Sequence, residues 1–212
     1  MLEGFKRWTI AATLAVALGM SLGAKAAIIH ESASLGATGQ TTGPSIIASD
    51  AWSGSRFSLS EAVNVTQIGG HLLGAFGDVF GAIIALASPS ATPANMTDVV
   101  NSVVASTTFA PPSPSTDFRT PLSVALAAGD YALVFGSGAL GASGGARIPL
   151  NNTDNPGASY FSCGTSQCFN GGFQNARFVV EGTVVPLPAA LPLLATALAA
   201  LGLLGWRRRQ AA

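Results

Sequence analysis

The chain has 212 residues, enough for one domain with targeting segments, and it carries 49% hydrophobic but only 9% charged residues. A typical soluble domain is about one-quarter charged, and much of the apolar excess lies at the two ends of the chain. Between residues 27 and 183 there are four arginines, no lysine and nine carboxylates, a net charge of −5. This acidic composition argues against nucleic-acid binding, which needs clustered lysine and arginine against phosphate.

The first 26 residues have the pattern of a secretory signal peptide. The basic pair Lys6-Arg7 precedes an apolar stretch over 8–23, and the small residues Ala24 and Ala26 form an A-x-A cleavage site. The apolar stretch is short for a stable membrane span. We therefore expect export by the Sec machinery and cleavage by signal peptidase after Ala26, with an uncleaved anchor as the alternative.

Short β-rich runs follow, separated by Gly, Pro, Ser and Asn. Alternation of apolar and polar residues predicts strands at Arg56–Leu59 and Val63–Thr66, and the continuous apolar run Val79–Leu86 predicts a core strand. Val103–Phe109 predicts a further strand, or the end of a short helix that begins near Thr97.

The second half of this region continues the same pattern. Leu122–Leu126 and Tyr131–Phe135 flank Ala127–Asp130, which predicts a hairpin with a four-residue turn. Pro111–Ser115 predicts a stiff exposed connection, and Arg177–Thr183 predicts a last strand. Short strands with turns between them indicate an all-β fold class, a single β-sandwich over 27–183 with a jelly roll as the expected form.

The two cysteines, Cys163 and Cys168, predict a disulfide, because the chain is expected to be exported to an oxidising compartment. Closing so small a loop would contribute about 2 kcal/mol by the chain-entropy relation. A redox or metal pair is the alternative, but the spacing is not C-x-x-C and no histidine cluster accompanies it.

Catalytic and metal signals are weak. His30, expected to be mobile near the mature N-terminus, and His71, expected to be structural or at the surface, are the only histidines. A zinc site needs three or four ligands. Neither a P-loop nor a G-x-G-x-x-G fingerprint occurs in a strand–turn–helix context. We therefore expect no metal, no cofactor and no enzymatic activity, with a single serine or histidine nucleophile as the remaining enzymatic alternative.

The loop 151–155 (Asn-Asn-Thr-Asp-Asn) holds the densest group of oxygen donors, with Asn152 and Asp154 as candidate ligands. Calcium prefers such oxygen ligands. Only one of the five side chains is a carboxylate, and Asn and Asp also favour turns for local reasons. Calcium binding and plain turn formation both stay open.

Aromatic residues gather around the cysteines, among glycines and amides, and such rings can stack on sugars. Local packing around the disulfide is the alternative. Tyr160 and Phe161 are the principal candidates, Phe169 and Phe173 lie close by in the sequence, and Trp52 is a similar candidate elsewhere in the domain.

The C-terminal segment, 184–209, has three parts in order. A short proline-containing motif is made by Val185, Pro186, Leu187, Pro188 and Ala189. The 20 uncharged residues from 187 to 206 match the length of about 20 that a membrane-spanning helix needs. The cluster Arg207, Arg208 and Arg209 marks the cytoplasmic side, which places the preceding domain outside the cytoplasm.

This motif, span and arginine cluster resemble the VPLPA variant of the PEP-CTERM sorting signals (VPLPA-CTERM) of Gram-negative bacteria, over about 25 residues, 185–209. The resemblance implies that an exosortase, an integral-membrane cysteine transpeptidase, recognises the motif and releases the tail. A plain tail anchor is the alternative. The order Gly69-Gly70-His71, Phe80–Ile83 and 122–138 also resembles a β-sandwich ectodomain found upstream of such signals, for which no activity is assigned.

The sequence therefore predicts a non-catalytic exported protein, anchored as an inner-membrane precursor and processed by an exosortase. Its expected destination is the cell surface or the extracellular matrix, with a link to exopolysaccharide or biofilm that the resemblance implies. The alternative is a carbohydrate- or calcium-binding β-sandwich module tethered to the membrane.

Overall fold

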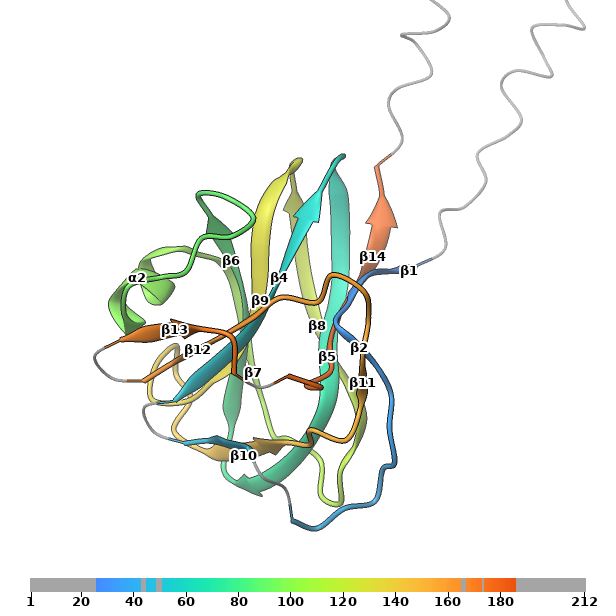
Figure 1. Ribbon diagram of the computed structural model, residues 1–212, viewed down its shortest axis with the longest axis vertical. Helices are drawn as coiled ribbons and strands as arrows, with labels where there is room; N and C mark the ends of the chain where they lie inside the picture. Colours follow the sequence, from blue (N-terminus) through green and yellow to red (C-terminus); the bar gives the residue numbers. More distant parts are fainter. Residues whose placement is uncertain (1–25, 43–44, 49–50, 165–166, 173, 186–212) are drawn as a thin grey trace, which may run out of the picture.

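The computed structural model describes residues 26–42, 45–48, 51–164, 167–172 and 174–185. Within them the fold is nearly all β, with two six-stranded antiparallel sheets, one two-stranded ladder and one short helix (Figure 1). The predicted all-β class is confirmed. Apart from Ala26 and Val185, the predicted signal peptide, sorting motif, membrane span and arginine cluster lie outside the described residues.

The first sheet is built around the long strand β5. Its strands are β1 (Ala27–Glu31), β3 (Ser45–Ile47), β5 (Val63–Phe76), β8 (Thr116–Leu126), β10 (Gly145–Ile148) and β14 (Phe178–Val184). β8 and β14 both pair with β5 over its first part, and β10 pairs with its last residues. β1 pairs with β14, and β3 pairs with β10.

The second sheet has the order β13-β12-β4-β9-β6-β7. Its strands are β4 (Trp52–Leu59), β6 (Val79–Leu86), β7 (Val103–Phe109), β9 (Gly129–Gly136), β12 (Tyr160–Cys163) and β13 (Cys168–Asn170). A separate small ladder pairs β2 (Ala33–Ser34) with β11 (Thr153–Asp154). Each predicted strand corresponds to a strand of the structure. The predicted hairpin turn between β8 and β9 does not agree with it.

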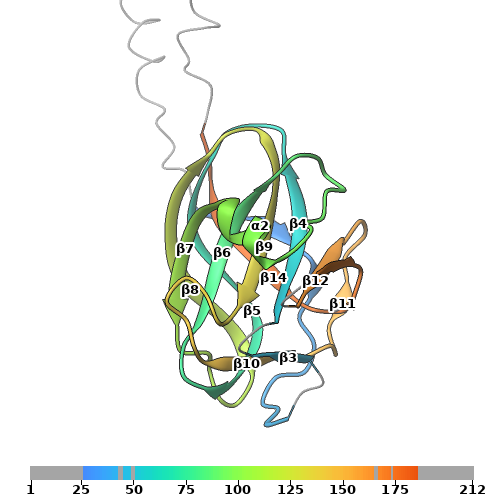
Figure 2. The same cartoon turned by 90° about the vertical axis from the view of Figure 1, so that its left-hand side faces the viewer.

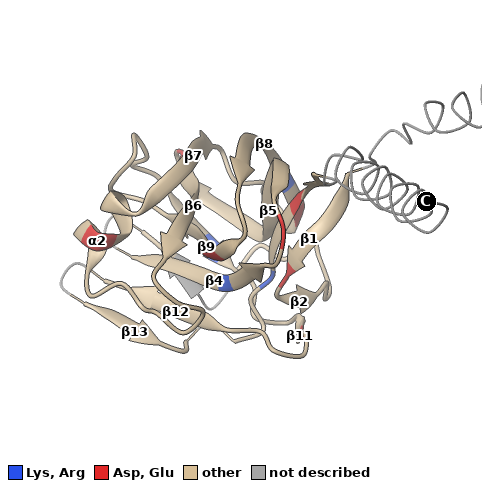
Figure 3. Ribbon diagram, turned by 90° about the horizontal axis from the view of Figure 1, so that it is seen from above, with Lys and Arg blue, Asp and Glu red and all other residues tan. Residues whose placement is uncertain are grey.

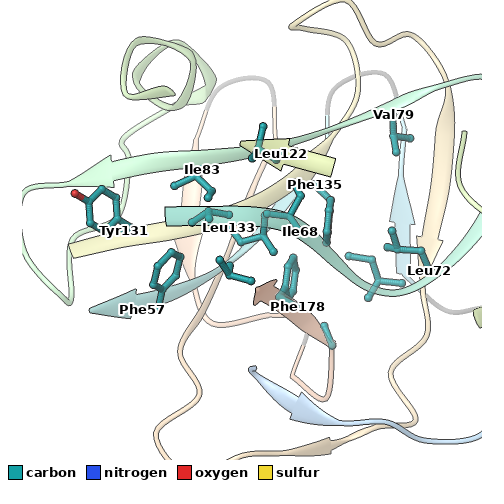
Figure 4. Close-up of a cluster of buried hydrophobic side chains, with 14 of the residues drawn as sticks. Phe57, Ile68, Leu72, Val79, Ile83, Leu122, Tyr131, Leu133, Phe135 and Phe178 are labelled. Carbon is teal, nitrogen blue, oxygen red and sulfur yellow. The ribbon is translucent and has the colours of Figure 1, made fainter. Parts of the chain in front are cut away.

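The main core lies between the two sheets, in a β-sandwich-like arrangement (Figure 2). Ile68 and Phe178 come from the first sheet, and Leu133 and Phe135 come from the second. The rings of Phe135 and Phe178 stack with centroids 5.3 Å apart, and Figure 4 shows these side chains pointing toward one another. Contacts of this kind hold the sheets together by removing apolar surface from water.

The central strands of the second sheet are buried on both faces, which explains the continuous apolar run in β6. Val79 and Ile83 face the main core, whereas Phe80 and Ile84 belong to a second apolar cluster on the other face. That second cluster includes Val99 of helix α2 (Met96–Asn101). Strands covered on both faces have apolar runs in place of alternation.

The predicted hairpin between β8 and β9 is wrong. β8 pairs with β5 in the first sheet, whereas β9 pairs with β4 and β6 in the second. The connection over Ala127 and Ala128 therefore crosses from one sheet to the other. Leu126 before it and Tyr131 after it both point into the main core. Two strands with alternating apolar residues and a short connection fit a hairpin within one sheet and a connection between two sheets equally well. The local sequence pattern therefore could not distinguish the two arrangements.

Of the two alternatives for Val103–Phe109, the strand is observed, and a separate short helix, α2, precedes it. Asn95 caps α2 by accepting a hydrogen bond from the Asp98 N–H at 3.0 Å, which satisfies an otherwise unpaired donor of the first turn. The helix ends at Asn101, and β7 begins two residues later and pairs with β6.

Candidate functional site

A polar pocket of about 400 Å³ lies at the edge of the second sheet, where β4 meets the β12–β13 hairpin. Its lining includes Arg56 from β4 and Tyr160 and Asn170 from the hairpin strands. Asp154 of β11 and Gln174 complete the longer side chains, with serine hydroxyls between them. The volume is in the range of small-molecule sites, but the lining is far more polar than usual.

Arg56 holds the floor of this pocket together. Along β4 it alternates with Phe57, which belongs to the main core. The Arg56 guanidinium donates hydrogen bonds to the carbonyl oxygens of Ala91 and Tyr160, both at 2.8 Å. It also donates to the side-chain oxygens of Ser159, Thr92 and Asn170. These five bonds use all five N–H groups of the side chain.

The charge of Arg56 has no carboxylate partner among the ion pairs of the described residues. The side chain is buried, and this burial lowers the pKa of Arg56. Arginine nevertheless keeps its proton in proteins. The guanidinium carbon also lies 4.9 Å from the ring centroid of Phe161, a cation–π contact. The pocket floor is thus positive but has no hydrogen-bond donor to spare.

Asp154 places a negative group on the pocket wall. Its Oδ1 accepts hydrogen bonds from the Tyr160 hydroxyl at 2.6 Å and from the Asn175 backbone N–H at 2.7 Å. Burial raises the pKa of Tyr160, and the hydrogen bond to Asp154 raises it further, so the phenol stays a donor. Because both bonds end on Oδ1, the other oxygen of this exposed carboxylate is left to accept from a ligand or from water.

Several pocket groups have unused hydrogen-bonding capacity. The Asn170 side chain accepts through its oxygen from Arg56 and Thr92, and no bond of its amide nitrogen occurs among the described residues. Gln174 is exposed, and neither its amide nor the Ser90 hydroxyl is engaged within the described part of the chain. Together with Asp154 they offer both donors and acceptors to a polar molecule.

The predicted ligand residues separate in the structure. Tyr160 and Asp154 line the pocket, whereas Trp52 and Phe161 are core residues with at most 1% exposure. Trp52 packs edge-on against Phe80 with centroids 4.6 Å apart. Neither of these buried rings presents a face on which a sugar could stack. Arg56 and Asn170 were missed, because nothing local marks a lone arginine in an alternating strand as the floor of a pocket.

Asn152 is a buried connector within the fold. Its side-chain oxygen accepts from the Gly36 N–H at 3.0 Å and lies 2.9 Å from Nδ1 of His71. Its amide nitrogen donates to the carbonyl oxygens of Pro149 and Asn175. The side chain is therefore fully used in holding its loop against the first sheet.

The other amides of the 151–155 loop are engaged as well. Asn151 donates to the Ala37 carbonyl, and Asn155 donates to the Glu31 carbonyl and accepts from Ser34. No group of three or more His, Cys, Asp or Glu side chains able to hold a metal occurs among the described residues. These contacts give the loop a structural role, in agreement with the turn-forming alternative.

The two histidines are both packed into the fold. His71 has no exposed surface and its Nε2 lies 3.1 Å from the Ser115 hydroxyl, so of the two expected positions, structural or at the surface, the structural one is found. The expectation of a mobile His30 is wrong. Its ring stacks on Phe57 with centroids 5.1 Å apart, and its Nε2 lies 3.0 Å from the Ser55 hydroxyl. Ser115 is buried too, so the 111–115 connection is only partly exposed.

The predicted disulfide is present and closes the β12–β13 hairpin, where Cys163 and Cys168 are directly paired. Phe169 follows the bridge and is 53% exposed, but it does not line the pocket. Phe173 lies outside the described residues. The bridge thus fixes the hairpin that supplies Tyr160 and Asn170 to the pocket.

The glycine-rich segment after β9 fits two catalytic patterns by spacing alone. Residues 136–141 match G-x-G-x-x-G, and residues 141–145 match G-x-S-x-G around Ser143. Both patterns need a strand–turn–helix context, whereas this segment leads from β9 into the strand β10. The two histidines bond to Ser55, Asn152 and Ser115 instead of Ser143.

Comparison with known proteins finds no relative of this chain among family models or curated proteins. The fold and the site together define a β-sandwich-like domain with a polar pocket at the edge of one sheet.

Proposed function

We propose that this chain is a non-catalytic exported protein, sorted through its C-terminal VPLPA-type signal and processed there by an exosortase. In this proposal the precursor sits in the inner membrane with its jelly-roll-type domain outside the cytoplasm. The processed protein is delivered to the cell surface or the extracellular matrix, where it accompanies exopolysaccharide.

The observation that carries the proposal is that the first and last strands of the domain lie next to each other. β1, which begins at Ala27, pairs with β14 in the register Ala27 to Gly182, so the described chain begins and ends on neighbouring strands, next to the segments for which we propose the two signals. Figure 1 shows the two ends of the ribbon side by side, away from β3 and β10. A domain built this way keeps its body clear of the membrane while either end is anchored.

The disulfide is a second support, because such bonds persist in oxidising compartments outside the cytoplasm. The proposed membrane span lies beyond Val185. Among helices in the described part of the chain, none has the length and apolar character to cross a membrane.

Intact-mass measurement of the protein from its own host, in cell-envelope and medium fractions, tests the proposal. We expect a species that begins at Ala27 and ends between Val185 and Pro188, with or without an added group. The double substitution Pro186→Ala with Pro188→Ala should leave the tail attached, whereas Thr183→Ala, just before the motif, should not affect processing. A wild-type species that begins at Ala27 and still ends at Ala212 would reduce the signal to a plain anchor.

A further inference from the structure

We propose that the pocket between β4, the β12–β13 hairpin and Asp154 is a carbohydrate site that binds one neutral hexose unit through its hydroxyl groups. This inference goes beyond the sorting proposal, because it rests on the geometry of the folded domain and holds whether or not the C-terminal tail is removed.

The lining determines the polarity of the ligand. Four groups have no hydrogen-bond partner within the part of the chain that the structure describes: the amide nitrogen of Asn170, the amide of Gln174, the Ser90 hydroxyl and one oxygen of Asp154. These are donors and acceptors in mixed order around one space, and each sugar hydroxyl can both donate and accept. An apolar ligand would leave all of them without partners, at a cost for each buried polar group.

Two features disfavour an anionic ligand. Among the described residues of the lining, Arg56 is the one cationic group, and its five N–H groups are all donated to protein oxygens. It therefore cannot form the paired hydrogen bonds with which arginine usually holds a carboxylate or phosphate. Asp154 is exposed in the same pocket and would repel an anion. The pocket holds one charge of each sign and suits a neutral molecule.

The size and rigidity of the pocket fit a single sugar unit of a longer chain. A space of about 400 Å³ that is open to solvent can hold a pyranose ring with its ends leading out. Arg56 ties the Ala91–Thr92 segment to the hairpin, and the disulfide closes the hairpin itself. Preformed walls of this kind lower the ordering cost of binding.

The test uses the full chain in a detergent without a sugar head group. Saturation-transfer NMR and calorimetry measure binding of glucose, galactose, mannose and N-acetylglucosamine, with glucuronate as the anionic probe. We expect at least one neutral sugar to bind and glucuronate to bind more weakly.

Two variants connect that binding to the pocket. Gln174→Ala removes one amide and should weaken binding about threefold to tenfold, the value of one neutral hydrogen bond. Asn170→Asp keeps the oxygen that accepts from Arg56 but removes the free N–H donor, so it should weaken binding about threefold to tenfold, as the loss of one neutral hydrogen bond does. Because the new carboxylate lies beside Arg56, this variant should remain folded.

Matched controls lie outside the pocket. Gln167→Ala, in the turn of the same hairpin, and Asn64→Asp, exposed on β5, should bind the sugar as the wild type does. The proposal is overturned if no neutral sugar binds, or if Gln174→Ala and Asn170→Asp bind like the controls. It is equally overturned if glucuronate alone binds and high salt abolishes that binding.

Discussion

His30 shows how one side chain couples the fold to pH. The ring is largely enclosed between Phe57 and Ser55, and burial lowers the pKa of His30 to about 4, against a smaller opposing effect of Glu31. The imidazole is therefore neutral in the folded protein at neutral pH, whereas in the unfolded chain it takes up a proton near pH 6.5.

We expect the protein to lose stability as the pH falls from 6.5 to 4. In this window the unfolded chain binds a proton that the folded chain excludes, so protonation favours unfolding. The His30 contribution is complete above pH 6.5, and its loss amounts to roughly 3 kcal/mol at pH 4. Urea unfolding at a series of pH values measures it. His30→Phe, which keeps a stacking ring, should remove this slope; an unchanged slope in the variant would assign it to other groups.

Gly70 is required by the close approach of two strands. A Cβ atom at this position of β5 would lie 2.0 Å from the carbonyl oxygen of Arg177, next to β14. Backbone atoms in the middle of a paired sheet cannot move aside as the end of a flexible side chain can.

We therefore expect Gly70→Ala to lower the free energy of unfolding by roughly 3 kcal/mol, at the upper end of ordinary overpacking costs. The comparison is Gly164→Ala, where a Cβ would meet nothing within 4 Å and the change should stay within about 0.5 kcal/mol. Chemical unfolding of both variants measures the difference, and equal stabilities would show that the strands can separate without loss.

At the scale of elements, the β12–β13 hairpin depends on its bridge. β13 has three residues and pairs only with β12 within the described residues, at the outer edge of the second sheet. None of the three β13 side chains is buried: Cys168 is half-buried, and Phe169 and Asn170 are exposed. Short edge strands of this kind have little packing of their own to hold them.

Removing the bridge by Cys163→Ala with Cys168→Ala should cost about 2 kcal/mol, the closure entropy of so short a loop. For a domain of this size the melting temperature would fall by roughly 4–8 °C. Thermal unfolding followed by circular dichroism measures the change, and reduction of the wild type serves as the control because it should reproduce the loss. If the double substitution reduced the free energy gained on sugar binding by more than it lowered the free energy of unfolding, the bridge would mainly shape the pocket.

For the whole molecule, a charge network joins strands that are distant in sequence. Arg177, just before β14, pairs with Glu31 of β1 and with Asp117 of β8 at 3.0 Å, and Arg119 connects Asp117 to Glu181. Burial alone would raise the pKa of Asp117, but hydrogen bonds from Arg177 and Arg119 hold it below its usual value. Figure 3 shows how little of the ribbon is charged and that charged segments gather near β1 and β5.

Arg177→Met should destabilise the protein by roughly 3 kcal/mol, because it leaves the Glu31 carboxylate without its cation and removes one of the two arginines that pair with Asp117. The Arg177 side chain is only 6% exposed, compared with 19% for Arg119. Arg119→Met should therefore cost less. Urea unfolding at neutral pH compares the two, and a larger loss in the Arg119 variant would contradict this ranking.

Local sequence patterns were sufficient for the longer strands of the domain and for the disulfide, whereas β1, β2, β3 and the short strands β10 to β13 were not predicted. The strand Val79–Leu86 could be predicted because its apolar run is longer than a loop allows. The disulfide could be predicted because Cys163 and Cys168 are close in sequence. The chain also supplied the expectation of export, since signal peptides and sorting signals are linear patterns that do not depend on the fold.

Only the tertiary structure decided which sheet each strand joins and which side chains meet at the pocket. The same alternation in β8 and β9 suits a hairpin or a crossing between sheets, because alternation identifies the face of a strand and not its neighbour. Arg56, Asp154 and Asn170 are separated by up to 114 residues, and Trp52 became a core residue only because a second apolar layer covers its sheet. Long-range pairing of this kind depends on the summed burial of both sheets, which no local window of the sequence contains.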